Sequence, residues 1–153
     1  MNFDKRKALL VARLYEERRR AYHHARGAIL GSTGGSFQGK AHNSGKWSGG
    51  RSVEARATRL EALDRLPWVK EMRAVEHARD RIGSSLPDEM KELLKKAIML
   101  NCVSGRKYPF ERLYTVGISR RGFYRYRETF LCDIANELLL SKNRKGELNY
   151  VDT

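Results

Sequence analysis

Residues 110–140 read FERLYTVGISRRGFYRYRETFLCDIANELLL, and the expected fold follows from this stretch. A short segment of helical character comes first, Gly117 and Ile118 follow it, and Ser119 precedes a long segment that begins with basic residues. Glycine adopts the left-handed backbone conformation of a tight turn at little cost, and serine commonly caps the first N–H groups of a helix. A short helix, a glycine turn, an apolar residue, a serine cap and a basic helix, in this order, are typical of a helix-turn-helix.

In a helix-turn-helix the residues just after the cap project into the major groove of DNA. Four side chains at these positions are candidates for contacts to base edges: Arg120, Arg121, Tyr124 and Arg125. Arginine suits this role because it can donate two hydrogen bonds to one guanine. Contacts to DNA phosphates add affinity but carry no sequence information. Five further residues are candidates for such contacts: Arg106, Lys107, Arg112, Ser119 and Arg127.

The long helix also carries an apolar stripe. Its members recur at helical spacing and predict a buried face: Phe123, Tyr126, Phe130, Ile134 and Leu138. Leu113 and Arg112 depart from the usual helix-turn-helix pattern, which has alanine or glycine four residues before the turn glycine and an apolar residue before that. A basic helical hairpin with no role in groove reading is therefore the structural alternative.

A helix is also predicted over residues 85–104. Ser85 is a candidate cap, a proline is tolerated in a first turn, and two acidic residues follow where the helix dipole favours them. Gly105 ends the segment. Its apolar stripe consists of Met90, Leu93, Leu94, Ala97, Ile98 and Leu100. Together with the stretch above, this segment predicts a helix-turn-helix DNA-binding domain over residues 85–141.

The rest of the chain divides into four expected segments. Residues 1–30 predict one basic amphipathic helix, since apolar residues recur along one face and no proline interrupts them. Residues 31–51 hold seven of the thirteen glycines and predict a flexible Gly/Ser-rich loop. Residues 52–84 predict a helical connector that Pro67 ends or kinks. Residues 142–153 predict a polar tail.

The charge of the chain indicates an acidic partner. Its 153 residues carry 31 Lys and Arg against 18 Asp and Glu, a formal net charge of +13. One basic concentration lies in residues 1–30, with a net charge of +5, and another in 106–127, with seven basic residues and one acidic residue. Such an excess favours nucleic acid as the partner.

Other classes of protein find no support in the sequence. No run approaches the ~20 apolar residues of a membrane span, and we expect no secretory signal. Cys102 and Cys132 do not make a disulfide framework. The adjacent His23 and His24 would point to different faces of a helix, so no metal site is expected. No phosphate-binding loop or paired catalytic groups stand out, and we expect neither an enzyme nor a cofactor.

Residues 97–139 resemble the C-terminal part of phage late-transcription regulators of the RinA/ArpU type, over about a third of the chain. That family has a sigma-region-four-like helix-turn-helix, with a serine-capped S-x-x-x-F/Y-Y-R-x-R helix and an I-A-x-x-L tail. The matching elements here are Ser119, Phe123-Tyr124-Arg125, Arg127 and Ile134-Ala135-Glu137-Leu138. The resemblance implies a phage or prophage activator that binds DNA at a late promoter.

We therefore expect an all-α protein that regulates transcription by binding double-stranded DNA at a promoter in the cytoplasm of a bacterial host cell. RNA polymerase and a second copy of the chain are the further expected partners. Two alternatives stay open. A small-terminase-like packaging protein would recognise phage DNA and assemble into a ring, whereas an architectural or RNA-binding protein would use its charge alone and lose affinity steeply with salt.

Overall fold

The computed structural model of the chain describes residues 2–31, 49–105 and 110–147, and these ranges contain seven α-helices and no strand. The all-α prediction is therefore confirmed for this part of the chain. Residues 32–48 of the predicted loop and 148–153 of the predicted tail lie outside it. In chain order the helices are α1 (Asn2–Arg13), α2 (Tyr15–Gly31), α3 (Gly49–Asp64), α4 (Pro67–Arg81), α5 (Asp88–Ser104), α6 (Phe110–Thr115) and α7 (Arg120–Glu147).

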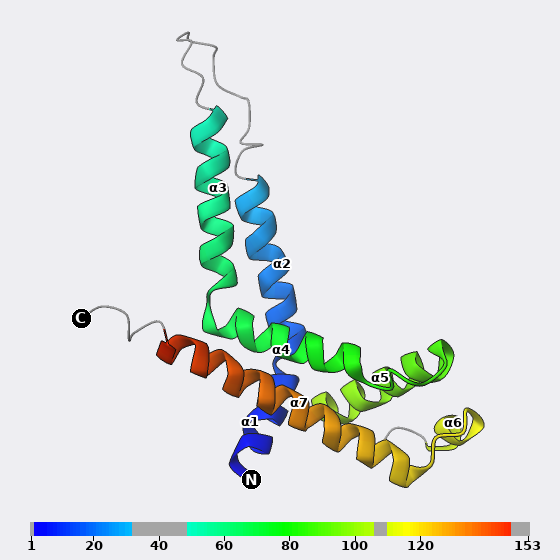
Figure 1. Cartoon of the computed structure of the whole chain (residues 1–153). Helices are drawn as coiled ribbons and strands as arrows, with labels where there is room; N and C mark the ends of the chain where they lie inside the picture. Colours follow the sequence, from blue (N-terminus) through cyan, green and yellow to red (C-terminus); the bar gives the residue numbers. More distant parts are fainter. Residues whose placement is uncertain (1, 32–48, 106–109, 148–153) are drawn as a thin grey trace.

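The core lies where α1, α4, α5 and α7 pack together (Figure 1). Four members of the stripe predicted on α7 are buried, as expected, and the fifth, Tyr126, is half-buried. The other helices contribute further buried apolar side chains, among them Ala8, Val11, Tyr15, Val69, Met72, Val75, Leu94 and Ile98. The stripe predicted on α5 is wrong at Leu100, which is 43% exposed. The core covers α5 only on the side that bears Leu94 and Ile98.

The N-terminal segment forms two helices rather than the single helix predicted over residues 1–30. The division falls at Leu14, between α1 and α2. Helical hydrogen bonds still reach this residue, since its N–H donates to the Leu10 carbonyl at 3.1 Å and its own carbonyl accepts from Arg18 N–H at 3.0 Å. The break lets α1 stay in the core while α2 leaves it (Figure 1). Packing of the two halves against different neighbours therefore overrides a continuous helical pattern.

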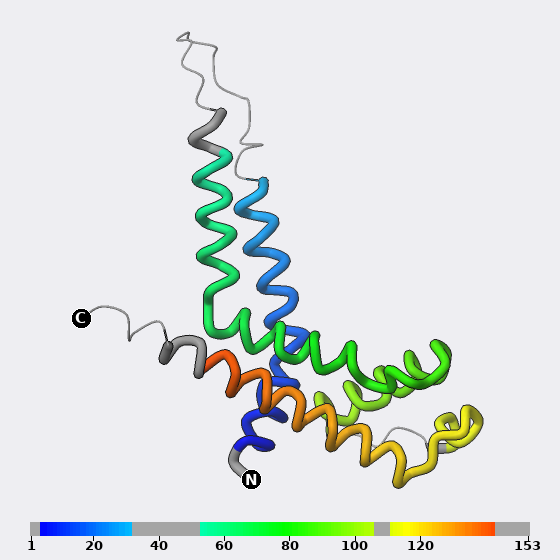
Figure 2. The backbone as a smooth tube through the Cα atoms, in the orientation of Figure 1, coloured from blue at the N-terminus to red at the C-terminus, as the bar shows by residue number. Residues whose placement is uncertain are grey.

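Helices α2 and α3 lie side by side and project from the core as an arm (Figures 1 and 2). Helix α3 begins at Gly49, so the last three residues of the predicted loop are helical. It ends at Asp64, and α4 begins at Pro67 after an extended Leu66 with φ −61° and ψ 138°. The predicted break at Pro67 is confirmed, since proline is tolerated in a first helical turn but not within a helix.

A cluster of polar side chains joins the base of the arm to α4. The Tyr22 hydroxyl of α2 donates a hydrogen bond to Asp64 Oδ1 of α3 at 2.8 Å. From α4, Arg73 Nη2 donates to the Tyr22 oxygen at 2.9 Å and to Asp64 Oδ1 at 3.0 Å. The Arg73 guanidinium also lies 5.3 Å from the centroid of the Tyr22 ring, a favourable cation–π position. Three helices thus share one network at the point where the arm leaves the core.

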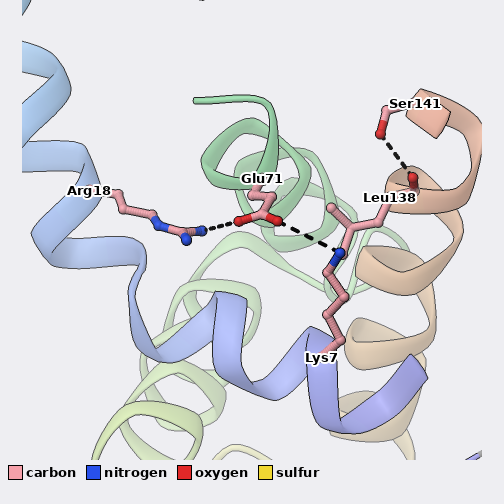
Figure 3. Close-up of polar contacts among 5 residues, drawn as sticks. All are labelled: Lys7, Arg18, Glu71, Leu138 and Ser141. Carbon is pink, nitrogen blue, oxygen red and sulfur yellow. Dashed lines mark hydrogen bonds and ion pairs between the residues drawn. The ribbon is translucent and has the colours of Figure 1, made fainter. Parts of the chain in front are cut away.

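A second link lies next to it. Figure 3 shows Glu71 of α4 between Arg18 of α2, whose Nη1 lies 2.6 Å from Oε2, and Lys7 of α1, whose Nζ lies 3.8 Å from Oε1. Nearby on α7, the Ser141 hydroxyl donates to the Leu138 carbonyl at 2.8 Å. Because Glu71 contacts both α1 and α2, it holds the two halves of the divided N-terminal segment in place.

The Asp64 network predicts a sensitivity to acid. The Tyr22 hydrogen bond and then Arg73 hold the pKa of Asp64 below its ordinary value. Such a carboxylate stabilises the fold above its unfolded-state pKa, about 3.9, and the stabilisation is lost as the pH falls through the lower folded-state pKa. We expect urea unfolding to show that the native protein loses more stability below about pH 4 than Asp64→Asn does. Equal losses would contradict this, and Asp88→Asn, outside the network, is the matched control.

The domain predicted over residues 85–141 differs from the structure at its two ends. Helix α5 begins at Asp88 after Pro87, and no side chain caps it, so Ser85 is not its cap. Its C-terminal end is as predicted, with Gly105 in the left-handed conformation at φ 66° and its N–H bonded to the Asn101 carbonyl. Helix α7 continues to Glu147, beyond the expected end of the domain.

Candidate nucleic-acid interface

The turn between α6 and α7 has the backbone that the sequence predicts. Gly117 has φ +83°, the left-handed conformation that favours glycine. The Leu113 carbonyl accepts hydrogen bonds from the N–H groups of Val116 at 3.2 Å and Ile118 at 2.9 Å, which closes the end of α6. Leu113 and Ile118 are both buried. Leucine therefore stands where a small residue was expected because its side chain joins the core.

Ser119 caps α7, as predicted. Its Oγ accepts a hydrogen bond from Gly122 N–H at 3.1 Å, and its carbonyl accepts from Phe123 N–H at 2.9 Å. The cap fixes the first turn of α7, and the buried Phe123 anchors that turn in the core. A Cβ added to Gly122 would lie 3.3 Å from Ser119 Oγ, so glycine at this position suits the cap itself.

The four predicted base-contacting residues all lie on the exposed part of the first turns of α7. Arg121 and Arg125 are one turn apart and point away from the buried side that Phe123 occupies. Tyr124 is 38% exposed and packs edge-to-face on Phe123, with ring centroids 5.3 Å apart. Arg120 is exposed as well. The structure thus gathers three arginines and a tyrosine at the capped end of one helix.

The predicted phosphate-contacting residues are more scattered. Arg112 is exposed on α6, and Ser119 is exposed at the cap. Arg127 is half-buried and turns to α5, where its Nε donates to Asn101 Oδ1 at 2.6 Å. It takes this direction because it follows Phe123 by one turn, on the same side of α7. Its contact to phosphate stays a prediction, and the bond to Asn101 leaves it only the Nη groups as donors for that contact. Arg106 and Lys107 lie outside the described residues.

Arg127 also borders the buried thiol of Cys102 on α5. Burial raises the pKa of this thiol, and the neighbouring Arg127 and Arg13 oppose the rise. Arg13 of α1 donates from its Nε to the Cys102 carbonyl at 3.3 Å. One arginine from α7 and one from α1 therefore support α5 behind the exposed end of α7, a role that the sequence pattern did not reveal.

Glu128 is the acidic residue nearest in sequence to the exposed arginines at the start of α7. It follows Arg121 and Arg125 at i+7 and i+3, and its carboxylate forms an ion pair and hydrogen bond with Lys5 of α1. This bond raises the pKa of Lys5. The two partners are 123 residues apart in the chain, so no local pattern could have indicated the contact. Arg125 also lines a pocket together with side chains that include Ser84, Ser85 and Phe130.

Within residues 2–31, 49–105 and 110–147, no three His, Cys, Asp or Glu side chains come together as metal ligands would. No helix in these ranges combines the length and the apolar character that crossing a membrane requires. His23 and His24 are both exposed on α2.

No protein-family model matches the chain, and neither does any curated protein or any solved structure.

Proposed function

We propose that this chain is a sequence-specific regulator of transcription that binds double-stranded DNA through a helix-turn-helix formed by α6 and α7. Helix α5 supports the unit from behind through Asn101, and α7 is anchored in the core by buried residues from Phe123 to Leu138. Arg120, Arg121, Tyr124 and Arg125 read base edges in the major groove. The protein acts in the cytoplasm of a bacterial host, without a catalytic step and without a cofactor.

One observation carries this proposal: two exposed arginines stand one turn apart on the capped, N-terminal end of a long helix whose other side is anchored in the core. The positive end of the helix dipole favours phosphate near that cap. A major groove about 12 Å wide admits an α-helix of about 10–12 Å diameter. Arginines held this way can reach guanine edges without a rearrangement of the fold.

The biological assignment rests on the resemblance of residues 97–139 to phage late-transcription regulators of the RinA/ArpU type. We propose that the protein activates phage or prophage late genes and acts together with RNA polymerase. That family has a sigma-region-four-like helix-turn-helix, and the resemblance therefore implies a site close to a promoter.

A footprint of the purified protein across its own genomic neighbourhood tests the proposal. At about 150 mM salt, where nonspecific binding to phosphate is suppressed, we expect a discrete protected site beside a promoter. The absence of any discrete site, with affinity that depends on salt but not on sequence, would leave charge-driven binding to DNA or RNA as the better account.

The arm favours a second candidate function, that of a small-terminase-like packaging protein. Such proteins need a segment for self-assembly, and the arm exposes Leu30 by 45% and Val53 by 61% of their surfaces. A packaging protein would form a large ring in solution and would protect a packaging site instead of a promoter. Light scattering on the purified protein, together with the footprint, separates the two functions.

A further inference from the structure

The exposed face of α7 extends beyond the two arginines. Arg121, Arg125 and Glu128 follow one another at i, i+4 and i+7, so they form one stripe on the helix surface. All three are exposed, and the stripe lies on the side of α7 away from Phe123 and Ile134, which are buried. A DNA duplex that contacts Arg121 and Arg125 would therefore also lie close to Glu128.

The geometry of the helix sets Glu128 back from the capped end of α7. Glu128 lies seven positions after Arg121, which corresponds to about 10 Å along the helix axis. The major groove is about 8.5 Å deep. If the capped end of α7 lies deepest in the groove, as in a helix-turn-helix, Glu128 is the member of the stripe nearest the phosphates. A lone carboxylate there would oppose binding, because like charges repel.

Helix α1 supplies the positive charge that this position needs. Lys5 pairs with Glu128, with 36% and 49% of the two side chains exposed, so the pair stands at the surface. Arg6, the next residue, is exposed. Asp4, two residues before Arg6, lies about 200° away around the helix and points in another direction. The start of α1 therefore places Lys5 against the Glu128 end of the stripe, and the exposed Arg6 is next to Lys5 in the chain.

We propose that the first turn of α1 is a second DNA-contacting element, in which Lys5 neutralises Glu128 and Arg6 contacts a phosphate at the edge of the groove. This inference rests on the proposed binding of DNA through α7. It gives the N-terminal helix a role in affinity: α1 adds phosphate contact and leaves the choice of sequence to Arg121 and Arg125. The contact depends on the fold, since only the packing of α1 on α7 brings Lys5 to Glu128.

A charge cycle on Lys5 and Glu128 tests the first part. We expect Lys5→Gln to weaken binding to cognate and random DNA alike, by about fivefold at 150 mM salt, because it leaves one charge uncompensated at the phosphates. Glu128→Gln should bind at least as tightly as the native protein. The double variant K5Q/E128Q should recover the affinity that K5Q loses. No recovery in the double variant, with all three variants folded by circular dichroism, would overturn the role assigned to Lys5.

Arg6→Ala tests the second part, with Arg20→Ala as its matched control. Both arginines are exposed and both changes remove one positive charge, but Arg20 lies on α2, the helix that leaves the core with the arm. Because Arg6 binds a phosphate in this arrangement, a plot of log affinity against log salt concentration should be shallower for Arg6→Ala than for the native protein, by about 0.9 in slope. Arg20→Ala should keep the native slope.

The outcomes separate this inference from the proposed function. Equal slopes for Arg6→Ala and Arg20→Ala, with a native footprint in place, would overturn the contact by α1 and leave the DNA-binding function standing. If the native protein gives no discrete footprint, the proposed function and this inference are both overturned. A shallower salt dependence for Arg6→Ala, but not for Arg20→Ala, supports the contact between α1 and phosphate.

Discussion

Phe130→Ala is expected to destabilise the protein by about 3–5 kcal/mol, the usual cost of removing a buried phenylalanine side chain. Phe130 is 1% exposed and lies in the middle of α7, the helix that packs on α4, α1 and α5. The loss combines the burial of the ring with the cavity that its removal leaves. Since small domains are stable by about 5–15 kcal/mol, urea unfolding followed by circular dichroism should show a large decrease of the midpoint.

Leu140→Ala is the matched control for this change. It removes an apolar side chain from the same helix at a position that is 53% exposed, so a change within about 0.5 kcal/mol is expected. Similar midpoints for Phe130→Ala and the native protein would mean that α7 does not form the centre of the core. The comparison also matters for function, because Phe130 follows the exposed end of α7 by about two turns and holds it in place.

Removing both arginines that are proposed to read the groove is expected to abolish most of the discrimination between DNA sequences. Each good arginine–guanine pair contributes about 1–3 kcal/mol of discrimination, so Arg121→Ala combined with Arg125→Ala should lower the ratio of cognate to random affinity by about 30-fold or more. Binding to random DNA should fall much less. Competition binding with a labelled cognate fragment, at one fixed salt concentration, measures the ratio directly.

Arg112→Ala is the control for the charge that the double variant loses. Arg112 is exposed on α6, outside the stripe on α7, and a phosphate contact from it would support all sequences equally. Its removal should weaken cognate and random DNA by the same factor. If Arg121→Ala and Arg125→Ala also weakened all sequences alike, the assignment of α7 to groove reading would be wrong, and the binding would be electrostatic only.

Several features follow from residues whose own chemistry restricts the backbone nearby. Gly105 and Gly117 end α5 and α6 in the left-handed conformation, Pro67 begins α4, and Ser119 caps α7. Each of these depends on atoms within four residues of the position, so a local pattern is sufficient to predict it. The same holds for the apolar stripe of α7, which its periodicity predicts and burial confirms at Phe123, Phe130, Ile134 and Leu138.

Local patterns failed where neighbours distant in the chain compete for a segment. The pattern of residues 1–30 is continuous, yet the helix divides at Leu14, because α1 packs in the core and α2 packs along α3. Ser85 has the residue type of a cap and does not act as one. Leu100 fits the apolar stripe of α5 but lies on the side of that helix that the core leaves exposed.

The candidate interface shows the same division. Residue type and spacing were sufficient to place Arg121 and Arg125 on an exposed face after a cap, since a helix fixes the direction of its own side chains. Only the packing of distant helices turned Arg127 to Asn101 and brought Lys5 to Glu128. Backbone conformation is set by short-range sterics and hydrogen bonds, which the sequence carries locally. Which side chains meet across helices depends on how the whole chain packs, and that arrangement exists only in the folded molecule.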